Sequence, residues 1–219
     1  MFSYDNKVFD VINKIVDWLF VSLLWLLFSL PVVTVGASTT ALFETVHKVI
    51  RRGKGYVWRT FWTTFKSNFK KATIIWLIQL GILLLLWGDM KIMEMVLEQG
   101  SKFGALYYFF YVTMFMVYVW VVYTCVYIAR IEDTIKVTMK NAAFMAIMNL
   151  PWAIVIVAAF IGAVVLASVS PICAFILPTG VFVLYDIILM RIFGKYIPME
   201  DEDKVEEHSA ESIVEVVEE

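Results

Sequence analysis

The chain is poor in the side chains that carry out most enzymatic chemistry. Among its 219 residues it has only two histidines and two cysteines. His47 lies in a basic segment and His208 in an acidic tail, while Cys125 and Cys173 lie inside long apolar runs. Thiols in such runs are more often packing residues than a disulfide or a metal pair. We therefore expect no metal site and no bound cofactor.

Sequence motifs of common catalytic sites are also missing. The chain has no G-x-x-x-x-G-K-[ST] phosphate cradle, no H-E-x-x-H or C-x-x-C ligand pair and no G-x-S-x-G nucleophile turn. These absences argue against an intramembrane hydrolase, so we expect a protein that is not an enzyme and has no catalytic residues. Nucleic acid is not an expected partner either.

Charged residues are scarce, and this scarcity excludes a soluble domain. They make up 17% of the chain, against 61% hydrophobic residues, and the mean hydropathy is +0.79. A small globule could not bury so much apolar surface, whereas a bilayer accepts it if the backbone is hydrogen-bonded within each segment. The composition predicts an all-α, polytopic membrane helical bundle.

Four long stretches contain no Asp, Glu, Lys or Arg. They cover residues 18–43, 72–88, 103–129 and 141–185. About 20 helical residues span the hydrocarbon, so the first three each fit one crossing. The fourth is long enough for two, and Pro171 marks the turn between them because proline disfavours helix continuation. We predict about five transmembrane helices, at about 18–37, 72–89, 104–129, 147–167 and 172–191.

These crossings divide the chain into three parts. Residues 1–17 form a short amino-terminal amphipathic segment, and residues 18–198 form the transmembrane helical domain. Residues 199–219 form a tail in which ten acidic residues face one lysine, a composition that predicts disorder. Within the first crossing, Pro31 and Gly36 leave open whether the stretch from Pro31 to Ser38 is a kinked crossing or a re-entrant element.

The basic residues between the crossings predict the orientation. The connections at 44–71 and 130–140, together with the carboxyl-terminal segment, hold 14 Lys and Arg residues, whereas the alternate connections hold 4. Loops rich in Lys and Arg stay in the cytoplasm. We therefore expect the first loop and the carboxyl terminus to be cytoplasmic.

The first loop is expected to form a cytoplasmic or interfacial helical hairpin. A helix capped by Ser38 would run to Arg52, and the glycines of Gly53-Lys54-Gly55 would end it. Aromatic residues then recur at helical spacing between cations, which is typical of a helix at a membrane surface. The alternative that these rings pack on the crossings stays open. The candidate lipid or partner contacts are Arg51, Arg52, Lys54, Trp58, Arg59, Phe61, Trp62, Phe65, Lys66, Phe69, Lys70 and Lys71.

Three polar residues stand out inside the predicted crossings. Gln79 and Asn149 are uncharged, and such residues more often hydrogen-bond between helices than bind a substrate. Asp186 is the one deep acidic residue, and ionisable groups at this depth are costly. We expect Asp186 to form a structural ion pair with Arg191 or Arg130, with a role in transport as the second interpretation.

Two stretches of the sequence resemble a known family. The run LWLLFSLPVVTVGASTTAL at residues 24–42, followed by FKSNFKKAT at 65–73, is similar to the YesL family. The resemblance is specific over about residues 20–80. Members of that family are bacterial multi-pass membrane proteins of unknown molecular function, often encoded beside carbohydrate ABC importers. The resemblance implies a bacterial cell membrane as location, and it supplies no catalytic residues.

Two classes of function are compatible with these features. The first is a non-catalytic accessory or assembly component associated with carbohydrate uptake by an ABC importer. The second is a small transporter or permease-like subunit, with a path for a sugar lined by Gln79, Asn149 and Asp186. Expected partners are the lipid bilayer and importer subunits, while homo-oligomerisation and the identity of the sugar stay open.

Overall fold

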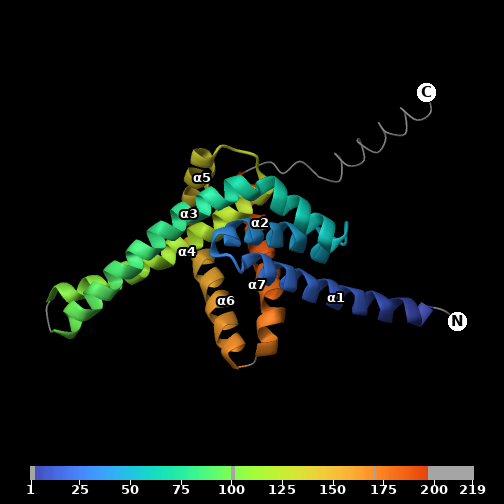
Figure 1. Cartoon of the computed structure of the whole chain (residues 1–219), viewed down its shortest axis with the longest axis horizontal. Coiled ribbons are helices and arrows are strands. Elements are labelled where there is room, and N and C mark those ends of the chain that lie inside the picture. Colours follow the sequence, from blue (N-terminus) through green and yellow to red (C-terminus); the bar gives the residue numbers. More distant parts are fainter. Residues whose placement is uncertain (1–2, 100–101, 170, 197–219) are drawn as a thin grey trace.

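A computed structural model describes residues 3–99, 102–169 and 171–196 (Figure 1). Within these ranges every regular element is a helix, which confirms the all-α prediction. The elements are α1 (Ser3–Ser29), the 3₁₀ turn η1 (Val32–Thr34), α2 (Val35–Thr45), the π-helical segment η2 (Val46–Arg51), α3 (Val57–Glu98), the 3₁₀ turn η3 (Lys102–Ala105), α4 (Leu106–Arg130), α5 (Ile135–Met148), α6 (Leu150–Val169) and α7 (Pro171–Tyr196).

Five of these segments are long and apolar enough to cross a membrane. They are Ile12–Ser29, Val57–Glu98, Lys102–Arg130, Leu150–Val169 and Phe175–Tyr196. The count and the order agree with the predicted crossings, so the chain is a polytopic helical bundle. The predicted amino-terminal segment 1–17 is not a separate element, because α1 runs through it from Ser3. The predicted tail 199–219 lies outside the described residues.

The predicted first crossing, 18–37, is wrong at its carboxyl end. Helix α1 ends at Ser29, and Pro31 takes an extended backbone conformation. Helix α2 then folds back along α1, since the Trp25 indole donates to Thr39 Oγ1 at 3.2 Å and the hydroxyls of Ser29 and Ser38 lie 2.5 Å apart. Of the two alternatives for this stretch, the structure has the break and reversal rather than a kinked crossing.

The predicted helical hairpin forms, because the turn at Gly53 and Gly55 leads from η2 into α3, which packs on α2. Its first helix, α2, lies inside the bundle and not at the surface. It packs against α1, α3, α4 and α7 near the centre of the molecule (Figure 1), and nine of its eleven residues are buried. The turn after it was predicted correctly, because Gly53 and Gly55 adopt φ values of 69° and 82°. This left-handed conformation is open to glycine without steric cost.

Helix α3 contains two segments that were predicted as separate helices. The predicted surface helix around residues 58–71 and the predicted second crossing, 72–89, are parts of one 42-residue helix. At 1.5 Å per residue its length is about 63 Å, which is about twice the thickness of the hydrocarbon core. Helix α4 packs along α3, and the two form one limb of the molecule (Figure 1).

The carboxyl-terminal half contains one element that the apolar pattern missed. Helix α5 is separate from α6, and Asn149 lies at the joint between them. The predicted break near Pro171 is confirmed, since α6 ends at Val169 and α7 begins at Pro171. Helices α6 and α7 pack on each other as a second limb, and α1 forms a third, so three limbs diverge from the region around α2 (Figure 1).

Candidate functional site

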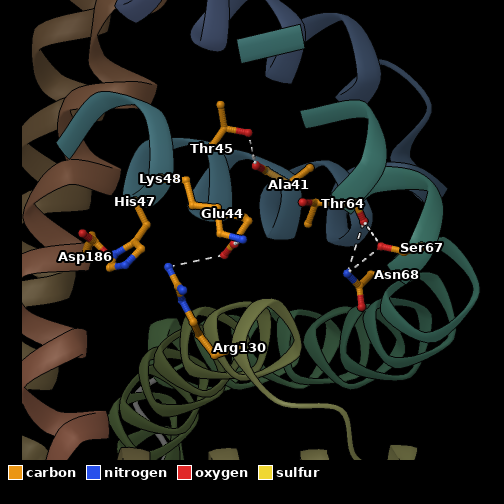
Figure 2. A network of polar contacts seen from close by, with 10 residues as sticks. All are labelled: Ala41, Glu44, Thr45, His47, Lys48, Thr64, Ser67, Asn68, Arg130 and Asp186. Atoms are coloured by element: carbon orange, nitrogen blue, oxygen red, sulfur yellow. Dashed lines mark hydrogen bonds and ion pairs between the residues drawn. The ribbon is translucent and has the colours of Figure 1, made fainter. Parts of the chain in front are cut away.

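A buried carboxylate on α7 meets two residues of η2. Asp186 is fully buried, and its Oδ1 lies 2.7 Å from His47 Nδ1. Its Oδ2 pairs with the guanidinium of Arg51. The expected ion pair therefore exists, but its partners are not Arg191 or Arg130. Figure 2 shows His47 of η2 pointing at Asp186 of α7.

Helical spacing explains how two side chains of η2 reach one carboxylate. His47 and Arg51 are four residues apart, and side chains at this spacing lie on the same face of a helix. A carboxylate only accepts hydrogen bonds, so His47 Nδ1 donates to Asp186. The opposite ring nitrogen, Nε2, is buried and has no hydrogen-bond partner. π-helical segments such as η2 often occur at functional sites.

A second set of ion pairs lies one turn earlier on α2. Glu44 is buried, and its carboxylate lies 3.4 Å from Arg130 Nη2 and 3.1 Å from Lys48 Nζ. Arg130, at the end of α4, is only 4% exposed and also lies over the ring of Phe43 at 5.9 Å. In Figure 2 Arg130 reaches from α4 toward Glu44.

Together these contacts form a polar cluster of Glu44, His47, Lys48, Arg51, Arg130 and Asp186. It ties α2 and η2 to both α4 and α7. A buried charge has a high free-energy cost unless it is paired with an opposite charge. The pairing of each carboxylate with its cations therefore holds α2 and η2 against α4 and α7. Among the described residues, no group of three or more His, Cys, Asp and Glu could hold a metal ion.

The sequence interpretation missed three members of the cluster, Glu44, His47 and Lys48. All three were assigned to a basic loop at the membrane surface, whereas the structure buries Glu44 and His47. A usable signal was present, because Glu44, His47 and Arg51 follow the i, i+3, i+7 spacing of one helix face. That spacing does not say which face is buried.

The other two predicted intramembrane polar residues have separate structural partners. Gln79 donates to Thr124 Oγ1 on α4 at 3.0 Å, and Thr124 donates in turn to the Trp120 carbonyl. Asn149 donates to the Met145 carbonyl at 2.8 Å and to the Tyr196 hydroxyl at 3.3 Å. Gln79, Asn149 and Asp186 thus bond to different groups, and these contacts do not join them into one site.

Removing the Gln79 bond should have a small effect. We expect Gln79→Leu to lower the free energy of unfolding by about 0.6 kcal/mol, the average for interhelical hydrogen bonds within a bilayer. The paired variant Gln79→Leu with Thr124→Val should cost no more than the sum of the single changes. Unfolding in mixed micelles measures both values. A loss of several kcal/mol in the single variant would contradict the small contribution expected of this hydrogen bond.

The first turns of α3 present two different faces. Phe61 and Phe65 are buried and pack on Phe28 of α1, with ring centroids 5.6 Å and 5.0 Å apart. Trp58 and Trp62 are 51% and 41% exposed, and their rings stack at 5.9 Å. The two alternatives for the aromatic residues are therefore both present on neighbouring parts of one helix face, because the partly exposed Trp62 also lies 5.7 Å from the Phe28 ring.

The predicted cations are divided in the same way. Arg51 turns inward to Asp186, and Lys71 lies within 3.5 Å of the Ile131 carbonyl. The remaining cations of the segment are exposed, as are three of the rings. We call these exposed α3 residues the basic aromatic face: Trp58, Arg59, Trp62, Lys66, Phe69 and Lys70. Arg52 and Lys54 lie in the exposed turn beside it.

Comparison with known proteins gives one match. Residues 18–90, about a third of the chain, match a family described as "Protein of unknown function, DUF624". This family includes YesL-like proteins. The matched stretch covers α2, η2, the basic aromatic face and most of α3. No curated protein and no solved structure is significantly similar to the chain.

Proposed function

We propose that the protein is a non-catalytic accessory or assembly component of a bacterial cell membrane, associated with carbohydrate uptake through an ABC importer. The YesL-like stretches of the sequence motivate the link to importers, and the DUF624 match covers the same part of the chain.

The observation that carries this proposal is the exposed basic aromatic face. Two stacked tryptophans and nearby cations are exposed on α3 beside Phe61 and Phe65, which pack on Phe28. Trp and Arg are enriched where proteins bind other proteins. A rigid helix anchored by Phe61 and Phe65 would present this face to a partner in a fixed position.

The buried polar residues favour a structural role over a transport path. Both oxygens of Asp186 are occupied by residues of the same chain, and Gln79 and Asn149 each have partners elsewhere. A sugar path needs several polar groups that converge on one space, because each hydroxyl must be compensated. The arrangement therefore favours the accessory role.

The ends of three elements lie close together, which supports the prediction that the basic connections lie on one side of the membrane. Glu44 pairs with Arg130, and Arg51 pairs with Asp186, so the end of η2, the end of α4 and the second half of α7 meet. Under the positive-inside rule this side is the cytoplasm. The basic aromatic face would then be available to the cytoplasmic side of an importer.

A site-specific crosslinking experiment tests the proposal. A photoreactive amino acid replaces Trp62 in one variant and Leu85 in a control variant, and both are irradiated in native membranes. Leu85 lies on the same helix, is 71% exposed and stands about 35 Å from Trp62 along the axis. We expect importer subunits to be captured from position 62 and not from position 85.

Charge reversal provides a second control for the same surface. The combined change Arg59→Glu, Lys66→Glu and Lys70→Glu should abolish capture at position 62 while leaving the protein in the membrane, because all three side chains are exposed. Recovery of lipid alone from position 62, or of the same proteins from both positions, would contradict docking through this face.

A further inference from the structure

A cavity of about 480 Å³ lies among six helices of the bundle, away from the polar cluster. Its lining side chains come from α1, α2, α3, α4, α6 and α7. Most of them are aliphatic or aromatic, and no charged residue lines the space. The volume is in the range of cavities that hold small molecules.

The hydroxyl groups at the cavity wall are bonded within the protein. Tyr118 and Tyr185 lie with their hydroxyls 3.2 Å apart. Tyr185 donates its proton to the Ile156 carbonyl at 2.8 Å, so Tyr118 donates to Tyr185. Neither phenol therefore has a donor left for a ligand in the cavity.

The two indole groups at the wall are occupied as well. Trp25 Nε1 donates to Thr39 Oγ1 at 3.2 Å, and Trp76 Nε1 donates to the Val32 carbonyl at 2.7 Å. Water needs two to four polar partners to be held in a cavity. Since the wall offers few polar atoms that are not already bonded, the space is suited to an apolar occupant and unsuited to water or a sugar.

The lipid around the helices is a source of apolar chains that could enter the cavity. The cavity opens sideways, because Phe160 and Val164 on α6 line it and are 42% and 52% exposed. These residues belong to a helix long and apolar enough to cross the membrane, so the opening faces hydrocarbon.

We propose that the cavity binds one alkyl chain of a membrane lipid, which enters between α6 and the α3–α4 limb. A cavity of about 150 Å³ holds the six carbons of benzene, so by simple scaling this cavity holds roughly 19 carbons. That is close to one long lipid chain and too little for two. The occupant is thus a single chain, held by shape and apolar contact rather than through its headgroup.

Small residues on α6 make room for the chain. Ala163 and Ala167 line the cavity, and both are half-buried. Ala158 lies on the opposite face of the same helix, is exposed and does not belong to the lining. The substitution Ala163→Phe therefore fills part of the cavity, whereas Ala158→Phe adds the same side-chain volume to the outer surface of the helix.

Photolabelling in a defined bilayer tests the proposal. The full chain is placed in nanodiscs of phosphatidylglycerol that carries a diazirine on one acyl chain, and labelled peptides are mapped after irradiation. We expect labelling of the wall residues Val121 and Val181 in the wild type. Ala163→Phe should lose this labelling, while Ala158→Phe should keep it at the wild-type level.

The same experiment can overturn the proposal. Equal labelling of Val121 and Val181 in wild type and Ala163→Phe would do so, as would labelling confined to outward residues such as Val165 and Leu166. Absence of label from Val121 and Val181 in the wild type would also overturn it. If Ala163→Phe is not monodisperse, Ala167→Phe takes its place with the same expected loss.

Discussion

Replacing Asp186 with asparagine is expected to lower the free energy of unfolding by about 3 kcal/mol. The carboxylate is fully buried and pairs with His47 and with Arg51, whose side chain is 35% exposed, so the change weakens two hydrogen bonds to a buried charged group. Losing one member of a buried pair is among the most destabilising single changes in proteins. Unfolding of the purified protein in mixed micelles measures the effect.

A double variant distinguishes two causes of the lost stability, the loss of charge pairing and the loss of side-chain packing. Arg51→Gln combined with Asp186→Asn removes both charges, and a neutral pair of similar shape should recover much of the stability lost in Asp186→Asn. The account also predicts that Arg191→Gln has little effect, because Arg51 and not Arg191 faces the carboxylate. An Asp186→Asn variant as stable as the wild type would contradict the structural role of the cluster.

Replacing Gly36 with alanine is expected to force α2 and α3 apart. A β-carbon at this position would lie 2.5 Å from Trp76 Cβ and 2.9 Å from the Ala72 carbonyl oxygen. Both atoms are fixed to the α3 backbone, so no side-chain rotation relieves the contact. Overpacking of this kind typically costs about 1–3 kcal/mol, and larger residues at this position should cost more.

Gly81 provides the matched control for this change. Gly81 lies on α3, the helix that Gly36 of α2 contacts, but a β-carbon at position 81 would meet no atom within 4 Å. Alanine is the better helix former, so Gly81→Ala should be neutral or stabilising by up to about 1 kcal/mol. Thermal denaturation of the two variants side by side gives the comparison. Equal effects at the two positions would contradict the close approach of α2 and α3.

Local signals in the sequence predicted the framework well. Long uncharged runs gave five crossings, and the backbone breaks at Gly53, Gly55 and Pro171 fell where they were expected. Each of these features depends on residues close together in the chain. A glycine with positive φ or a proline between two apolar runs acts wherever the rest of the protein lies.

The path of α2 could not be read from the same signals. An apolar helix buried by protein and an apolar helix facing lipid have similar compositions, and Ser38 and Thr40 could equally lie in a surface turn. The position of α2 inside the bundle depends on the close approach of Gly36 to α3 and on the hydrogen bonds that join Ser29 and Trp25 of α1 to α2. These are tertiary contacts, which hydropathy does not record.

The polar cluster was hidden for a related reason. His47 and Asp186 are 139 residues apart, and no spacing rule connects them. The expectation that Asp186 pairs with Arg191 or Arg130 relied on the predicted cytoplasmic end of the crossings, and the structure has Arg51 as the partner instead. For the basic aromatic face, helical spacing identified the rings, but only the burial of Phe61 and Phe65 in the folded chain separates them from the exposed Trp58 and Trp62.

Side-specific labelling of single cysteines tests the central claim that the basic connections and the end of α7 meet on one side of the membrane. With Cys125 and Cys173 replaced by serine, the exposed positions 54, 102 and 195 are changed to cysteine one at a time and treated with an impermeant maleimide in oriented vesicles. The account predicts that positions 54 and 195 react from one side and position 102 from the other. Reaction of positions 54 and 195 from opposite sides would contradict it.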